Sequence, residues 1–260
     1  MSTDAQVLAK PTSSLCCLNG SIHEGQPKGE ILSIEGVDSY IAKPGDGKDS
    51  GNIIIYSPDV NGFYNNAFLI MDVMAELSEC LVLGIDYFKG FDPWKWQQDH
   101  TDNPSQDAVS IEITPKWMKT VHSKYGRKGQ AKFACFGYCW GAPFVCDQLS
   151  ERGICVARAF AHHANLNDAN FSDLTKPLLM SLAQKDAVFK RDQRNEVVKI
   201  MEDCDKTFHV QLFSKISHGF AVQIGSLLIS VRRWVKEKSL QAIGQRLSYY
   251  LAESIESSVS

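Results

Sequence analysis

Short apolar runs alternate with longer segments of helical periodicity along most of the chain. The runs NIIIY at 52–56 and LVLGI at 81–85 are almost wholly apolar, which is typical of strands buried on both faces of a parallel sheet. Similar runs predict strands at 132–136, 156–161, 178–182 and 208–213. Helices are predicted by the spacing of Phe68, Met71, Met74, Ala75 and Leu77, and at 111–121, 142–149, 193–201 and within 227–251. This order predicts an α/β fold in which helices cover both faces of a mostly parallel central sheet.

The segment before these runs has a different character. Residues 1–29 are mixed and polar and predict a loosely ordered arm. The stretch EILSIEGVDSYIAKP at 30–44 predicts two short strands joined through Glu35-Gly36. No internal repeat or low-complexity linker divides the rest of the chain, so we expect a single domain over residues 30–260.

Composition and charge narrow the range of partners. The chain has 260 residues, of which 44% are hydrophobic and 22% are charged, as in an ordinary globular protein. The 27 Lys and Arg residues against 30 Asp and Glu residues give a formal net charge of −3. A nucleic-acid or anionic-membrane partner would favour a basic excess, so we expect neither. The expected partner is a small-molecule substrate, and the expected state is a monomer or homodimer.

Eight cysteines are more than such a chain needs, and they bear on the compartment. The N-terminal sequence carries Asp4 early and lacks the apolar core of a secretory signal. The apolar stretch at 221–231 is interrupted by Gln223 and is too short to cross a bilayer. No CxxC pair or zinc-like spacing occurs, and the adjacent Cys16 and Cys17 are best explained as part of a loop. We therefore expect a cytoplasmic protein with free thiols, no metal and no cofactor.

The most informative motif follows the predicted strand that ends at residue 136. There the chain reads GYCWG at 137–141 and continues into a predicted helix. This is the pattern of a nucleophile elbow, with Cys139 in the place where serine is commoner. The two glycines allow strand and helix to approach, and the turn aims the backbone N–H of Trp140 at a developing oxyanion. A chance GxCxG is the alternative, and the position between a strand and a helix argues against it.

An elbow nucleophile needs a base and an acid, which follow it in the order nucleophile, acid, histidine. Asp186 comes just after the predicted strand at 178–182, and His218 comes after the one at 208–213. His218 is expected to activate the Cys139 thiol, and Asp186 to fix the tautomer of the histidine. Separately, Asp186 is explained equally well as a turn or capping acid, and His218 as a loop histidine. The order and the strand-end positions of all three together favour a catalytic triad.

These motifs resemble the dienelactone hydrolase family within the α/β-hydrolase superfamily, and the resemblance extends from about residue 30 onward. GYCWGA at 137–142 is similar to the family's G-Y-C-x-G-G, KDAV at 185–188 to its G-x-x-D-x-x-V, and HGF at 218–220 to its histidine turn. DVNGF at 59–63 resembles the family's acidic residue before an oxyanion-hole turn. The resemblance implies an α/β-hydrolase fold, a contact between Asp59 and the thiol, and an oxyanion hole shared by the N–H groups of Val60 and Trp140.

The chain also departs from the family where dienelactone-cleaving members bind the substrate carboxylate with arginines. Val222 and Gly90 stand near those places, which suggests a less charged or more aromatic substrate. His162 and His163 follow the predicted strand at 156–161, where either imidazole lines the pocket or is a hydrogen-bonded structural histidine. The substrate pocket or the thiol contact is expected to involve Asp59, Phe63, Phe88, Lys89, Trp94, His162, His163 and Phe220.

Three functions remain open on this sequence. The first is a hydrolase of an ester, lactone or thioester of a small metabolite, acting through Cys139, His218, Asp186 and an acyl-enzyme. The second is a non-hydrolytic enzyme of secondary metabolism that uses the same site for cyclisation, decarboxylation or C–C bond cleavage. The third is a ligand-binding or redox-responsive protein with an exposed thiol, which would leave the positions of Asp186 and His218 unexplained.

Overall fold

The computed structural model describes residues 25–90, 105–148, 153–222 and 229–253. The first elements along the chain form a tight hairpin. Strands β1 (Glu30–Ile34) and β2 (Val37–Ala42) pair antiparallel. Glu35 and Gly36 join them with φ angles of 53° and 70°. Two successive residues with positive φ make a turn whose twist matches that of the flanking strands. The hairpin expected at Glu35-Gly36 is therefore confirmed.

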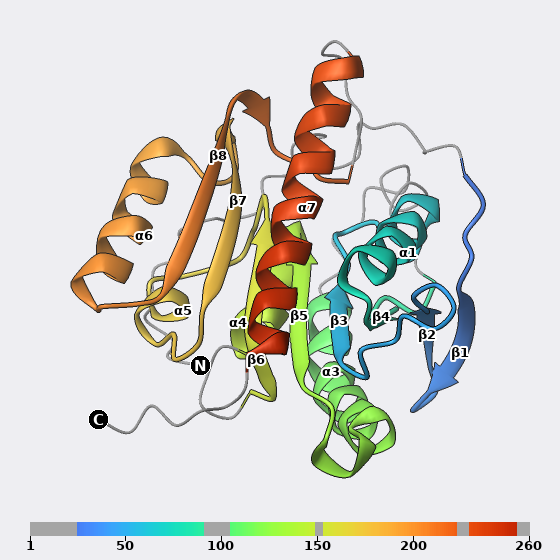
Figure 1. Ribbon diagram of the computed structural model, residues 1–260. Coiled ribbons are helices and arrows are strands. Elements are labelled where there is room, and N and C mark those ends of the chain that lie inside the picture. Colours follow the sequence, from blue (N-terminus) through green and yellow to red (C-terminus); the bar gives the residue numbers. More distant parts are fainter. Residues whose placement is uncertain (1–24, 91–104, 149–152, 223–228, 254–260) are drawn as a thin grey trace.

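The strands of the described ranges form one eight-stranded sheet in the order β1-β2-β4-β3-β5-β6-β7-β8 (Figure 1). β2 pairs antiparallel with β4, and every pair from β4 through β8 is parallel. The bounds of these strands are β3 (Ile53–Ser57), β4 (Leu81–Ile85), β5 (Phe133–Tyr138), β6 (Cys155–Ala161), β7 (Leu178–Lys185) and β8 (Phe208–Ser217). All of β3 and β5 is buried, as their apolar runs predict.

Helices cover both faces of the sheet, and each face has its own apolar core. In Figure 1, α7 and α1 lie in front of the sheet, and their buried residues pack into one core. Buried residues of the remaining helices pack into the other core, together with Phe133, Cys135 and Cys139. The bounds are α1 (Asn65–Ser78), α3 (Ser105–Tyr125), α4 (Ala142–Asp147), α5 (Ala169–Ser172), α6 (Arg191–Asp203) and α7 (Ile229–Ala252).

The structure corrects several details of the sequence prediction. β7 and β8 extend to Lys185 and Ser217, beyond the apolar runs, because their pairing continues across a register shift. α3 begins at Ser105, ahead of the apolar positions that mark it, and the short α5 carries too little periodicity to be predicted. Leu77 is 45% exposed, because the buried stripe of α1 passes through Met74 and Ser78 instead.

The order of the strands determines where a ligand can bind. The chain moves from β3 to β4 on one side and later from β5 to β8 on the other. Such a reversal opens a crevice beyond the carboxyl ends of the two central strands, which are β3 and β5 here. The sequence motifs all follow strand ends, so the parallel arrangement carries them to this one edge. None of the helices in the described ranges has the length and apolarity to cross a membrane.

Candidate active site

A strained turn after β5 presents Cys139. The backbone of Cys139 has a φ of 47°, which lies in the left-handed region that costs a non-glycine residue about 1–3 kcal/mol. The chain continues through a short 3₁₀ turn, Cys139–Gly141, into α4. A Cβ atom on Gly137 would lie 2.9 Å from the Ser57 carbonyl oxygen, and one on Gly141 would lie 2.2 Å from the same atom. Both glycines are therefore required for the elbow to pack against the end of β3.

Cys139, His218 and Asp186 meet at the carboxyl edge of the sheet. The Nε2 atom of His218 lies 3.3 Å from the Sγ atom of Cys139. On the other side of the ring, Nδ1 lies 2.9 Å from Oδ2 and 3.0 Å from Oδ1 of Asp186. The carboxylate assigns the proton to Nδ1, which leaves Nε2 to accept the thiol proton. All three residues are less than 9% exposed.

The turn that follows β7 prepares Asp186 for this contact. Its Oδ1 atom accepts hydrogen bonds from the backbone N–H groups of Val188 at 2.8 Å and Phe189 at 3.0 Å. Burial alone would raise the pKa of Asp186, but the hydrogen bonds and the charge of His218, together with these two N–H groups, lower it below its usual value. Asp186 is therefore a fixed carboxylate that holds His218 by Nδ1.

Asp59 lies on the neighbouring loop after β3, and its pKa is shifted in the opposite direction from that of Asp186. Its oxygens accept hydrogen bonds from the backbone N–H of Asn61 at 3.1 Å and from the side-chain amide of Asn61 at 2.9 Å. Burial raises the pKa of Asp59 to about 6, against the opposing influence of Asn61 and of the positive charge on His218. The expected contact of Asp59 with the thiol stays a prediction.

Two backbone amides are the candidates for an oxyanion hole. The N–H of Trp140 lies in the first turn after the elbow, where helical N–H groups have no acceptor within the helix. Val60 follows Asp59 on the loop that the elbow approaches through Gly141. The hydroxyl of Tyr87 donates a hydrogen bond to the Pro58 carbonyl and holds this loop from the side of β4. Their joint action on an oxyanion stays a prediction.

Aromatic rings surround the elbow. The ring of Phe88 lies 5.8 Å from that of Trp140, centroid to centroid, so the turn after β4 contacts the residue beside the nucleophile. Phe220, two residues after His218, is buried against His162 at 5.6 Å. Phe63 is half-buried and packs at 5.3 Å against Phe68 of α1. These contacts bring Phe88 and Phe220 close to the triad residues, while Phe63 belongs to the side of α1.

His162 and His163 are fully buried at the end of β6. His162 contacts the ring of His218 at 5.0 Å, and His163 contacts Phe189 at 4.0 Å. Burial lowers the pKa of His163 to about 3 and that of His162 well below its usual value, so both rings are neutral. No ring nitrogen of either residue has a hydrogen-bond partner within the described ranges. Aromatic rings contact both histidines, and whether either imidazole lines the substrate pocket stays a prediction.

Two further residues of the expected pocket are placed differently or not described. Lys89 is exposed in the turn after β4, where its backbone N–H donates to the Asp86 carbonyl at 3.2 Å. Trp94 lies outside the described residues, as do Cys16 and Cys17. Within those residues, no group of three or more His, Cys, Asp or Glu side chains is arranged to hold a metal ion.

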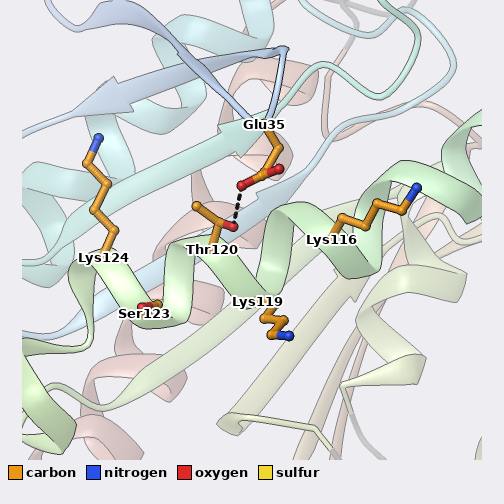
Figure 2. Close-up of a pocket in the computed structure, with 6 residues that line it drawn as sticks. All are labelled: Glu35, Lys116, Lys119, Thr120, Ser123 and Lys124. Atoms are coloured by element: carbon orange, nitrogen blue, oxygen red, sulfur yellow. Dashed lines mark hydrogen bonds between the residues drawn. The ribbon is translucent and has the colours of Figure 1, made fainter.

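A hollow of about 440 Å³ elsewhere on the surface does not compete with this site. Figure 2 shows that it lies along α3 beside Glu35 of the hairpin, and that Lys116, Lys119 and Lys124 extend in different directions from the helix. Glu35 accepts a hydrogen bond from Thr120 at 2.7 Å, and Lys116 pairs with Glu112 at 3.1 Å. The lysines around the hollow do not point toward a common centre, so the elbow is the candidate active site.

Sequence reasoning missed the side chains that shape the loop after β3. Asn61 stands two residues after Asp59, and this spacing is the signal of a turn in which an aspartate accepts the following N–H groups. Tyr87 lies in the turn after β4, but its hydrogen bond to Pro58 joins two strand ends that are far apart in sequence. No pattern within either segment indicates that contact.

Comparisons with known proteins show the family to which the chain belongs. The family model described as the dienelactone hydrolase family matches residues 37–251. The chain belongs to the dienelactone hydrolase family. It is 38% identical over 255 residues to dienlactone hydrolase 1 of Gibberella moniliformis, covering 95% of this chain and 97% of that protein. It is 34% identical to dienlactone hydrolase 2 of the same fungus, covering 94% and 97% of the two chains.

The fold is also found in a more distant enzyme. The crystal structure of carboxyl esterase 2 from Tuber melanosporum superposes with a TM-score of 0.64 at 14% identity, covering 89% of this chain and 90% of that one. At that identity the likeness shows the α/β-hydrolase fold alone. Membership of the dienelactone hydrolase family makes the chain a hydrolase, and the α/β-hydrolase fold expected from the motifs is confirmed.

Proposed function

We propose that this dienelactone hydrolase family member cleaves an ester, lactone or thioester bond of a small metabolite by nucleophilic catalysis at Cys139. The observation that carries the proposal is the continuous contact from Cys139 Sγ through the His218 ring to Asp186, with distances of 3.3 Å and 2.9 Å. A thiol, a base and an orienting carboxylate in this sequence of contacts have the arrangement that activates a nucleophile.

The first half of the proposed reaction forms an acyl-enzyme. Nε2 of His218 takes the proton from the Cys139 thiol while the sulfur attacks the carbonyl carbon of the substrate. The carbonyl oxygen becomes an oxyanion, and the N–H groups of Trp140 and Val60 stabilise it by hydrogen bonds. When the tetrahedral intermediate collapses, the bond to the leaving oxygen or sulfur breaks and that atom takes the proton from His218.

The second half returns the enzyme to its starting state. A water molecule attacks the thioester carbonyl and gives one proton to Nε2 of His218. The carbon–sulfur bond then breaks, and the proton returns to the sulfur of Cys139. Asp186 stays ionised throughout and stabilises the imidazolium that forms in each half.

The surroundings of the site favour an apolar or aromatic substrate. Phe88 and Trp140 form an aromatic side of the elbow, and Phe220 packs against His162, which contacts His218. Val222 is buried where dienelactone-cleaving relatives are expected to carry an arginine, and the side chain of Lys89 is exposed. A substrate carboxylate would need a positive partner in such a site. No observation favours the non-hydrolytic alternative.

The proposal includes a reducing, cytoplasmic setting. None of the six cysteines in the described ranges forms a disulfide, and five of them are buried. Free thiols persist in reducing compartments, and a thiol nucleophile must not be consumed by oxidation. The expected arm at 1–29, the single domain over 30–260 and the monomeric or homodimeric state stay predictions.

Hydrolysis of p-nitrophenyl acetate by purified variants tests the proposal. Cys139→Ala and His218→Ala are expected to reduce the rate to background, whereas Cys204→Ala, which removes an exposed thiol outside the site, is expected to retain it. Intact-mass analysis after rapid quenching should show one acetyl group on the wild type and none on Cys139→Ala. Full hydrolysis by Cys139→Ala would refute the thiol mechanism.

A further inference from the structure

The three residues after β6 contact all three loops that carry the triad. Ala164 donates its backbone N–H to the carbonyl oxygen of Cys139 at 3.1 Å. The ring of His163 lies 4.0 Å from that of Phe189, whose own N–H holds Asp186. The ring of His162 lies 5.0 Å from that of His218. This one segment therefore contacts the loops of the nucleophile, the acid and the base.

His162 makes the contact with the base, and it does so from a fixed position. Its backbone N–H donates to the Ser181 carbonyl of β7 at 3.1 Å. Its φ of 36° lies in the left-handed region, which is uncommon for residues other than glycine and costs energy that surrounding contacts must offset. The ring is stacked on Tyr138, the residue before the nucleophile, at 5.5 Å and an interplanar angle of 24°. His162 is thus wedged between the end of β5 and the catalytic histidine.

The contact with His218 has the geometry that restricts rotation of a ring. The planes of His162 and His218 cross at 80°, so one ring meets the other edge to face. Phe220 lies 5.6 Å from His162 and closes the same corner from the chain beyond His218. Asp186 holds the His218 ring at Nδ1, and Cys139 faces the ring at Nε2. The contact with His162 acts on the ring from the side, so it further restricts the plane in which Nε2 meets the thiol.

We propose that His162 is a positioning residue whose ring, rather than its nitrogens, holds the His218 imidazole in the plane that brings Nε2 to Cys139. This rests on the proposed function, because it assumes that His218 is the base for Cys139. The neutral state of His162, caused by burial, means that it adds no positive charge beside the imidazolium. In this proposal His162 acts on the catalytic base His218, whereas a pocket-lining histidine would contact the substrate.

Substitutions at His162 separate the ring from its nitrogens. His162→Phe keeps an aromatic ring of similar size for Tyr138 and His218, while His162→Ala removes it and leaves the same unfavourable φ. With p-nitrophenyl acetate, His162→Ala is expected to lower kcat about tenfold or more with little change in KM, because small misplacements of catalytic groups are costly. His162→Phe is expected to stay within about threefold of the wild type, since its ring repeats the contact.

A second readout does not depend on hydrolysis. The rate at which iodoacetamide modifies Cys139 is expected to fall several-fold in His162→Ala and to recover in His162→Phe, because a held imidazole assists ionisation of the thiol. Ile243→Ala, a buried truncation on α7, controls for a general loss of stability and is expected to leave both rates unchanged.

Equal losses of kcat and of the iodoacetamide rate in His162→Phe and His162→Ala would overturn the proposal, because the effect would then depend on the ring nitrogens of His162. So would wild-type rates in His162→Ala, or rates in Ile243→Ala as low as those of His162→Ala. If Cys139→Ala retained hydrolysis, the proposed function would fail, and the iodoacetamide comparison would still decide whether His162 positions His218.

Discussion

Asp59 is a buried carboxyl group whose protonation couples the site to folding. Its side chain is 2% exposed, and burial raises its pKa from an ordinary 3.8 to about 6. The folded state therefore binds more protons than the unfolded state between these two values. The free energy of unfolding must then fall as the pH rises from about 4 to about 6, because stability falls wherever the folded state holds the extra proton.

The size of this effect follows from the two pKa values. They differ by about two units, and each unit corresponds to about 1.4 kcal/mol, so ionised Asp59 lowers the free energy of unfolding by about 3 kcal/mol at about pH 7.5. At about pH 4.5 the same relation gives about 1 kcal/mol, since the folded carboxyl is then protonated. Asp59→Asn stays neutral, and its side-chain amide can still pair with Asn61. It is expected to gain about 2 kcal/mol more stability at the higher pH than at the lower.

Urea unfolding of wild type and variant at both pH values, followed by tryptophan fluorescence, measures this difference. Asp46→Asn makes the same change of charge at an exposed loop position and is expected to show no such pH dependence. Two results would refute the reasoning about Asp59. One is an equal gain at both pH values, and the other is no gain at about pH 7.5.

Three further predictions concern packing and thiols. In thermal unfolding, Gly141→Ala is expected to lose about 1–3 kcal/mol of stability, because its added Cβ clashes with Ser57. Gly244→Ala should instead gain up to about 1 kcal/mol, because no atom lies nearer than 3.5 Å to its added Cβ. Arg158→Met should be neutral or stabilising by about 1–4 kcal/mol in urea unfolding, because Arg158 is a fully buried guanidinium that forms no ion pair with a carboxylate in the described residues. A clear loss of stability would contradict this. In peptide mapping after brief iodoacetamide treatment, exposed Cys204 should be modified before Cys146, whose pKa is raised by burial, and the reverse order would refute the prediction.

The positions of the triad residues could be predicted because they depend on the sheet alone. Cys139, Asp186 and His218 each follow directly after a strand, and parallel strands bring their carboxyl ends to one edge. The glycines of the elbow could be predicted for a related reason. Strand and helix must approach closely there, and the distances at Gly137 and Gly141 leave no room for a side chain.

The side-chain contacts around the triad could not be predicted in the same way. His162 has a left-handed φ and its ring contacts His218, and no residue pattern near the end of β6 indicates either feature. Tyr87 reaches Pro58 only because β3 and β4 are adjacent in the sheet. The exposure of individual cysteines could not be predicted either. Nothing in the sequence around Cys204 distinguishes it from the buried cysteines, but it is exposed, because α6 ends before it.

Several energetic costs of this fold lie at the edge that carries the chemistry. The strands at the centre of the sheet are largely apolar, apart from the buried guanidinium of Arg158 in β6. At the carboxyl edge, by contrast, Cys139 and His162 both have positive φ, and Asp59 is buried with a raised pKa. A substitution that relieves any of these costs is expected to stabilise the fold and weaken the site together. Asp59→Asn therefore links the two: a gain of stability at neutral pH with a loss of esterase rate would place Asp59 in the function, and a gain with no loss would make it structural.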